Sequence, residues 1–284
     1  MIGEELARPA SRPTQTTELQ SNGGQGANWW SVERLLYGVA LVMGVWLRLW
    51  YLGSQPLSPW EASNSWPAWL MANGLSVTDA PTPTSALYYG LQWFLFWVGV
   101  NSDGGARFVS VVAGAILIIL PWWWQGFLGR RVALFLSFLI AIDSWLLGFS
   151  RLADGAIVAL TLGMLTLVAL SQVVQQPGDV TWKRIAAVSV GLLLVSGPMG
   201  WNLIPVVLWW GWLLYGGLSA TGLLQRQWLI WVAGAALIGA TFLFARLDGL
   251  AWAASGMSVW LSQFDGRSAG ALLPMVTGGY DLWW

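Results

Sequence analysis

Hydrophobic residues in this chain form long, nearly uninterrupted runs that short polar segments separate. A helix needs about 20 mostly apolar residues to cross the ~30 Å hydrocarbon core of a membrane. Seven stretches meet this length or nearly do: 35–53, 108–128, 132–149, 155–174, 185–199, 201–217 and 227–246. The pattern predicts an all-α fold, a polytopic transmembrane bundle of about seven spans within residues 31–246.

An eighth apolar stretch, residues 85–100, is shorter and contains Gln92. Lys and Arg in short loops mark the cytoplasmic face of a membrane protein. Eight cations fall on one face if this stretch does not cross, namely Arg8, Arg12, Arg34, Arg130, Arg131, Lys183, Arg184 and Arg226. We therefore expect a cytoplasmic N-terminus, a large outer loop over 54–107, and a segment 85–100 that lies in the outer interface or is re-entrant.

The two ends of the chain differ from the predicted bundle. Residues 1–30 are rich in Ser, Thr, Gln, Gly and Pro, which predicts a disordered cytoplasmic tail. Residues 247–284 are predicted to lie at the outer face, and the turn Gly197-Pro198-Met199-Gly200 lets the chain reverse between two spans. We expect an integral protein of the plasma membrane of a bacterium or archaeon.

Composition narrows the possible chemistry. The chain is 56% hydrophobic and 9% charged, whereas a soluble domain has roughly a quarter of its residues charged. Thirteen Lys and Arg balance 13 Asp and Glu, so no basic field attracts nucleic acid. Cys and His are both absent, which excludes thiol and imidazole catalysis and the usual zinc sites.

The 24 tryptophans fit interfacial anchoring, because an amphipathic ring prefers the headgroup layer. Trp60, Trp66 and Trp69 lie in the outer loop, where a platform for sugar stacking is the alternative.

Five ionisable residues converge on the predicted outer side of the membrane: Arg48, Glu61, Asp143, Arg151 and Asp154. Charge near the bilayer is costly, so each is a candidate functional residue.

Each of these residues also has a purely structural interpretation. Arg48 is able to snorkel to the headgroups, and Asp154 is able to cap the helix that follows it. Asp143 and Arg151 are eight residues apart and would pair on one face of a continuous helix. The structural interpretation of Glu61 is that it is a solvated residue in the outer loop.

Five segments together resemble the N-terminal module of GT-C glycosyltransferases. The closest branch is the dolichyl-phosphate-mannose protein mannosyltransferase and aminoarabinose transferase group. The segments are LRLWYLGSQPLSP, WEASNSWPAWLMANG, LYYGLQWFLFWVGV, ARFVSVVAGAILIILPWWWQGFLGRR and SRLADGAIVALTLG. The resemblance implies a bundle with in-plane helices in its outer loop, and an enzyme that takes a sugar from a polyprenyl-phosphate lipid.

This chain departs from the family pattern in several places. Where members have an Asp-Glu pair, the chain has Trp60-Glu61, and the His that often precedes the Leu-Tyr-Tyr segment is missing from PTPTSALYY. The chain is also short for the family.

The resemblance assigns roles to individual residues. Glu61 is the expected general base, and Arg151, with Arg48 second, would bind the leaving phosphate. Asp154 would orient the acceptor or share an Mg²⁺ or Mn²⁺ ion with Glu61. The other expected substrate-binding residues are Asp143, Tyr88 and Tyr89.

Other functions stay open at this stage. A degenerate homologue or split half would bind lipid or support a partner without catalysis. A transporter predicts internal repeats, which we do not find, and a structural subunit of a larger membrane complex would suit the Trp-rich surface.

Overall fold

Every element in the described part of the chain is an α-helix. The computed structural model describes residues 25–77, 80–215, 226–242, 245 and 247–264. The helices are α1 (Gln25–Leu49), α2 (Pro59–Ala72), α3 (Ala86–Trp97), α4 (Asp103–Leu128), α5 (Arg130–Ile142), α6 (Ser144–Ser150), α7 (Ala156–Gln175), α8 (Val180–Leu194), α9 (Pro198–Tyr215), α10 (Arg226–Thr241) and α11 (Gly249–Ser262).

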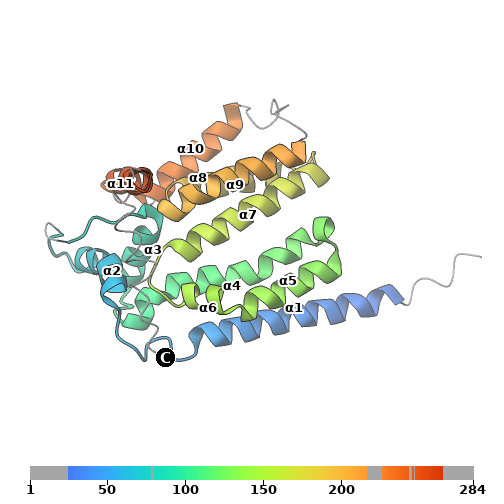
Figure 1. Ribbon diagram of the computed structural model, residues 1–284, viewed down its shortest axis with the longest axis horizontal. Coiled ribbons are helices and arrows are strands. Elements are labelled where there is room, and N and C mark those ends of the chain that lie inside the picture. Colours follow the sequence, from blue (N-terminus) through green and yellow to red (C-terminus); the bar gives the residue numbers. More distant parts are fainter. Residues whose placement is uncertain (1–24, 78–79, 216–225, 243–244, 246, 265–284) are drawn as a thin grey trace, which may run out of the picture.

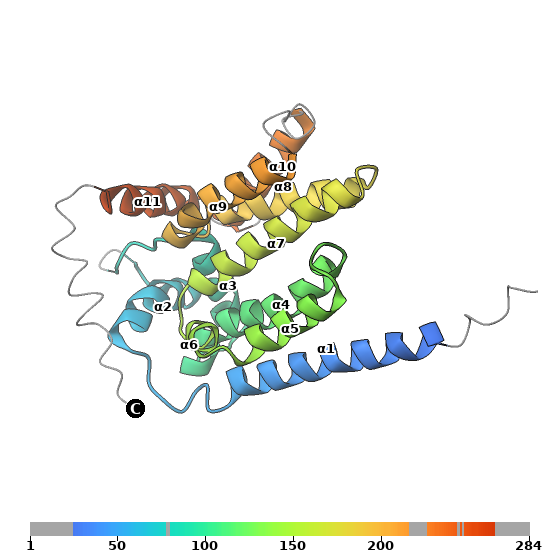
Figure 2. The same cartoon turned by 45° about the vertical axis from the view of Figure 1, so that its right-hand side comes forward.

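The longer helices run alongside one another and the shorter ones gather at one end. α1 packs against α4 and α5, α4 against α7, and α7 against α8 and α9, while α10 packs on α8 (Figure 1). Helices α2, α3, α6 and α11 lie at the same end of the bundle, where α6 packs beside α4 and α11 beside α3 and α9, and Figure 2 shows the same arrangement. We call this region the short-helix end.

Among the described residues, two helices are long and apolar enough to cross a membrane, α4 and α7. A third span is added if α5 and α6, which are bent by 58° at their junction, are counted as one. The described residues thus have the character of a membrane protein, and the finer prediction of seven spans stays a prediction.

The predicted ranges locate the helices well and their boundaries less well. Each of the seven predicted spans overlaps an observed helix, and the stretch 85–100 forms the short helix α3. Helix α1 begins at Gln25, so the predicted disordered tail is wrong over its last residues, and residues 1–24 lie outside the described part. Gly197, with φ of +96°, makes the predicted turn between α8 and α9, a backbone conformation that suits glycine.

The predicted continuous helix over 132–149 is wrong, because the chain breaks at Asp143. Asp143 adopts an extended conformation, and its side chain accepts a hydrogen bond from the backbone N–H of Leu146 at 2.8 Å. It therefore caps α6, as Asp commonly does at a helix start. The expected ion pair with Arg151 does not form, because the break turns the two residues away from a common helix face.

Arg48 compensates for this break from the neighbouring helix α1. Its side chain is 0% exposed, so the prediction that it snorkels to the headgroups is wrong. The guanidinium donates to the carbonyl of Ile140 at 3.2 Å and, more weakly, to that of Ala141 at 3.4 Å. These carbonyls belong to the last turn of α5, which has no helical donors beyond it and carries a partial negative charge.

Gly114 on α4 leaves the space that the Arg48 guanidinium occupies. A Cβ at Gly114 would lie 2.8 Å from Arg48 Nε and 2.7 Å from the Cβ of Ser150. Because both neighbours are fixed by packing, we expect Gly114→Ala to destabilise the protein by about 1–3 kcal/mol. Thermal unfolding in detergent measures this loss.

The matched control is Gly38→Ala on α1, where a Cβ would meet nothing within 4 Å. Equal melting temperatures for the two variants would contradict the close packing of α1, α4 and α6 around Arg48.

Candidate functional site at the short-helix end

Glu61 is placed by the local sequence at the start of α2. Ser58 is the N-cap and Pro59 follows it, a combination that favours helix initiation. Ser58 Oγ accepts from the Glu61 N–H, and Glu61 Oε2 accepts from the Ser58 N–H at 3.0 Å. This capping box turns the Glu61 carboxylate back toward the bundle. The side chain is 2% exposed, so the interpretation of Glu61 as a solvated loop residue is wrong.

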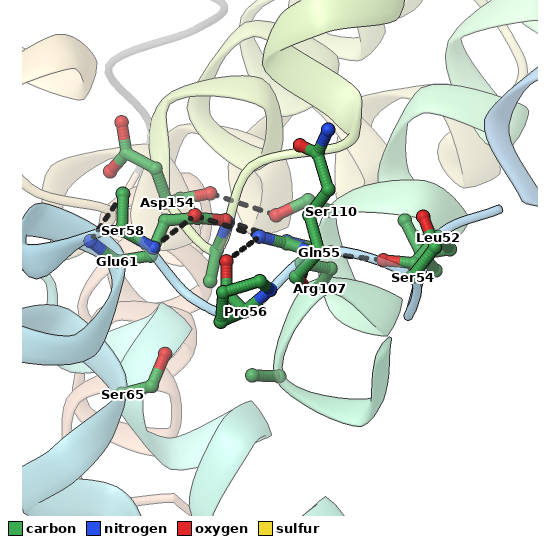
Figure 3. Close-up of polar contacts among 12 residues, drawn as sticks. Leu52, Ser54, Gln55, Pro56, Ser58, Glu61, Ser65, Arg107, Ser110 and Asp154 are labelled. Carbon is green, nitrogen blue, oxygen red and sulfur yellow. Dashed lines mark hydrogen bonds and ion pairs between the residues drawn. The ribbon is translucent and has the colours of Figure 1, made fainter. Parts of the chain in front are cut away.

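The partner of Glu61 is Arg107, in the first turns of α4. Arg107 Nε lies 2.7 Å from Glu61 Oε1 and Nη2 lies 2.9 Å from Oε2, a bidentate ion pair (Figure 3). Glu61 Oε1 also accepts from the backbone N–H of Ala153 at 3.0 Å. With Ser58, four N–H groups occupy the four lone-pair positions of the carboxylate.

Arg107 is equally saturated. Its Nη1 donates to the carbonyls of Leu52 at 2.9 Å and Gln55 at 3.0 Å, and Nη2 donates to that of Pro56 at 3.2 Å. Together with the two bonds to Glu61, these use all five guanidinium donors. The pair therefore joins the α1–α2 loop, α2, α4 and the loop before α7.

The Glu61 carboxylate stays ionised far into the acid range. Burial raises its pKa, but the hydrogen bonds from Arg107, Ser58 and Ala153 outweigh burial and bring the pKa down to about 2. A general base needs a free lone pair directed at its substrate and a pKa nearer the working pH. The geometry favours a structural role for Glu61, and its predicted role as base stays untested.

Asp154 is the second carboxylate predicted to act here, and its surroundings differ. It is half-buried in the loop before α7, and burial raises its pKa, against the lowering effect of the Gly155 and Ala156 N–H groups. Its backbone carbonyl accepts from Ser110 Oγ at 3.0 Å. The N-cap of α7 is Gly155, so the prediction that Asp154 is the cap residue is off by one position.

The remaining predicted site residues fall into two groups. Arg151 is half-buried in the same loop as Asp154, and its Nη2 donates to the Trp50 carbonyl at 2.7 Å. Arg48 and Asp143 belong to the α5–α6 break instead.

Tyr88 and Tyr89, predicted to bind substrate, are both buried. Tyr88 donates to the Ala106 carbonyl at 3.2 Å, and Tyr89 donates to the Pro67 carbonyl at 3.0 Å. In this arrangement they hold α3 against α2 and α4, and their predicted role in substrate binding stays untested.

The predicted Mg²⁺ or Mn²⁺ site does not fit the donor set. A divalent ion shared by Glu61 and Asp154 needs a free carboxylate oxygen on each residue, and the oxygens of Glu61 already accept four hydrogen bonds. Within the described residues no group of three or more acidic side chains is arranged to hold a metal ion.

The sequence interpretation did not include Arg107 among the candidate functional residues. A signal was available, because Arg107 stands at the head of the apolar run ARFVSVVAG. A cation at that depth requires a partner. The Ala153 N–H could not have been found in this way, because a backbone donor leaves no mark in the sequence.

Comparisons of this chain with protein-family models, with curated proteins and with solved structures find no match.

The Glu61–Arg107 pair makes stability depend on pH in the acid range. The folded-state pKa of Glu61, about 2, is below its ordinary value of 4.5, so the unfolded state binds more protons between these values. We expect the free energy of unfolding to fall as the pH drops from about 4.5 to about 2. Thermal scans in detergent across this range measure the slope.

Glu61→Gln leaves the Arg107 charge buried without its carboxylate partner, and we expect a loss of about 3–5 kcal/mol. The double variant Glu61→Gln/Arg107→Met removes both charges and should recover part of the stability. Its free energy of unfolding should also depend less on pH between about 4.5 and about 2, because the Glu61 carboxyl is gone. A wild-type slope retained in the double variant would contradict this account.

Proposed function

We propose that this chain is a membrane glycosyltransferase that takes a sugar from a polyprenyl-phosphate donor at the outer face. The observation that carries the proposal is the loop before α7. Asp154, a half-buried carboxylate whose pKa is raised by burial, lies three residues from the half-buried cation Arg151. A proton acceptor and a phosphate-binding cation are the two groups that the reaction needs.

A second feature supports a lipid-linked donor. An apolar groove of about 370 Å³ lies between α3, α4 and α7, and it starts one residue after Arg107 on α4 and four after Asp154 on α7. Its lining includes Leu91, Phe94, Phe108, Val112, Ile116, Val158 and Leu162. Because α4 and α7 are the two helices that qualify as membrane spans, the groove would take a hydrocarbon chain whose head reaches the loop.

The proposed reaction then uses Asp154 as the base. The acceptor hydroxyl gives its proton to the Asp154 carboxylate while its oxygen bonds to the anomeric carbon of the sugar. The bond from that carbon to the phosphate oxygen breaks, and the lipid phosphate leaves with its charge against Arg151. Glu61 and Arg107 act by positioning, since the Ala153 N–H that binds Glu61 belongs to the residue next to Asp154.

A non-catalytic homologue that supports a partner subunit is the second candidate. Trp60 occupies the position where the resembled family has its first acid, and it is 55% exposed. The carboxylate beside it, Glu61, is saturated by hydrogen bonds. A chain with these two features that releases no lipid phosphate would fit this second candidate.

The proposed topology places the N-terminus in the cytoplasm and the short-helix end outside, with seven spans. The chain has no cysteine, so single cysteines report position without background. We expect Ser54→Cys, in the exposed α1–α2 loop, to react in whole cells with a maleimide that does not cross membranes. Gly178→Cys, in the exposed α7–α8 turn, should react only after permeabilisation. The opposite pattern would refute the orientation.

Release of lipid phosphate from a panel of polyprenyl-phosphate sugars tests the reaction itself. Removing a general base typically slows turnover 10²–10⁴-fold, so we expect Asp154→Asn to lose about this much. Arg151→Ala should also slow turnover strongly. Asp248→Asn and Arg131→Ala change exposed charges elsewhere and should retain wild-type rates.

Turnover that is indifferent to Asp154→Asn would show that the base is wrongly assigned. No release from any donor by folded wild-type protein would exclude the enzyme proposal for those donors and favour the non-catalytic candidate.

A further inference from the structure

A second cavity lies at the short-helix end, between α2, α3 and the start of α4. Its volume is about 190 Å³, which is smaller than the pockets that hold drug-sized ligands. The residues that line it are Leu57, Ala62, Ser65, Trp66, Trp69, Phe96, Asn101, Ser102, Asp103 and Ala106. Part of this lining is aromatic and part is polar, and we call these its aromatic side and its polar side.

The aromatic side consists mainly of two stacked indoles. The rings of Trp66 and Trp69 are 5.0 Å apart with an interplanar angle of 16°, and Phe96 adds a third ring to the lining. The cavity distinguishes two tryptophans of α2 that are about equally exposed. Trp60, on the same helix, is 55% exposed and lines no part of the cavity, whereas Trp66 is 50% exposed and does.

The polar side offers both donors and acceptors. Ser65 Oγ accepts from Gln92 Nε2 at 2.9 Å and Ser102 Oγ accepts from the Gly105 N–H at 3.1 Å, so each hydroxyl keeps its proton to donate. Asp103 contributes an exposed carboxylate and Asn101 an exposed amide. This set matches a ligand that carries several hydroxyl groups.

The charge of the cavity selects against phosphate. Arg107 is the cation one turn from Asp103, and its charge is already matched by Glu61 at 2.7 Å. The carboxylate of Asp103 therefore gives the lining a net negative charge. A neutral ligand with an apolar face and hydroxyl edges fits these walls better than an anion does.

We propose that this cavity binds the ring of a neutral sugar, packed against the stacked pair of Trp66 and Trp69, with its hydroxyls bound to Asp103, Asn101 and Ser102. The site is separate from the loop of Arg151 and Asp154. In Figure 3, Ser65 of the cavity and the carboxylate of Asp154 lie on opposite sides of the Glu61–Arg107 pair. The proposal holds whether or not the chain transfers sugar.

Saturation-transfer difference NMR on the full chain in lipid nanodiscs tests the proposal. The probes are the methyl glycosides of glucose, mannose and galactose, each titrated alone. We expect saturable binding of at least one, weakened about tenfold by Trp66→Ala, since aromatic stacking contributes about this much. Asp103→Asn should weaken binding about tenfold as well, because it replaces a charged acceptor.

Two matched variants serve as controls. Trp60→Ala removes an equally exposed indole from the same helix, and Asp248→Asn neutralises an exposed acid at the start of another helix. Both should bind within twofold of wild type. Equal loss in Trp60→Ala and Trp66→Ala would show that the indoles only anchor the helix, which overturns the proposal.

Further outcomes also overturn it. Wild-type protein that binds none of the three glycosides excludes the neutral-sugar site. An anion site would be identified if inorganic phosphate binds, binds more tightly to Asp103→Asn, and no glycoside binds. A cation site would be identified if tetramethylammonium is the only probe that binds. Because binding is measured without a lipid donor, a failure here is distinguishable from a failure of lipid-phosphate release.

Discussion

The ion pair of Glu61 and Arg107 is the interaction on which the arrangement of the short-helix end depends. Every donor of the guanidinium and every acceptor position of the carboxylate is used, and the partners come from four separate segments. Replacing both partners of a buried pair of this kind with apolar groups is often tolerated, whereas removing only one of them is not. Here the geometry fixed by the pair includes the backbone beside Asp154 and the α2 segment that carries Trp66.

The chain accommodates two buried arginines in different ways. Arg107 is paired with a carboxylate, whereas the guanidinium of Arg48 is bound by backbone carbonyls of Gly44, Ile140 and Ala141. The first solution neutralises the charge and holds several loops together. The second relies on the partial charges at a helix end, which the break at Asp143 makes available in the middle of a long apolar segment.

The sequence predicted the helices better than it predicted their contacts. Apolar runs locate each long helix, because a helix buried in lipid or in a protein interior needs apolar side chains. The turn at Gly197 follows from the glycine and from Pro198 after it. The break at Asp143 was missed, since an Asp inside an apolar run is equally consistent with a paired charge on a straight helix. The sequence placed three residues in one region, Glu61, Arg151 and Asp154, and the structure also has them at the short-helix end. The pairing of Glu61 with Arg107 depends on how α2 folds back, which residue spacing does not specify.

The partners of Arg48 also constrain the order in which the protein is able to assemble. Two of the three carbonyl groups that bind its guanidinium belong to residues 92 and 93 positions later in the chain, and the third is that of Gly44. When the ribosome has completed α1, only the Gly44 carbonyl is present, so the guanidinium lacks its other two acceptors until α5 is made. The hydrogen bonds that tie α1 to α5 through Arg48 therefore form only after a further 92 residues have been translated.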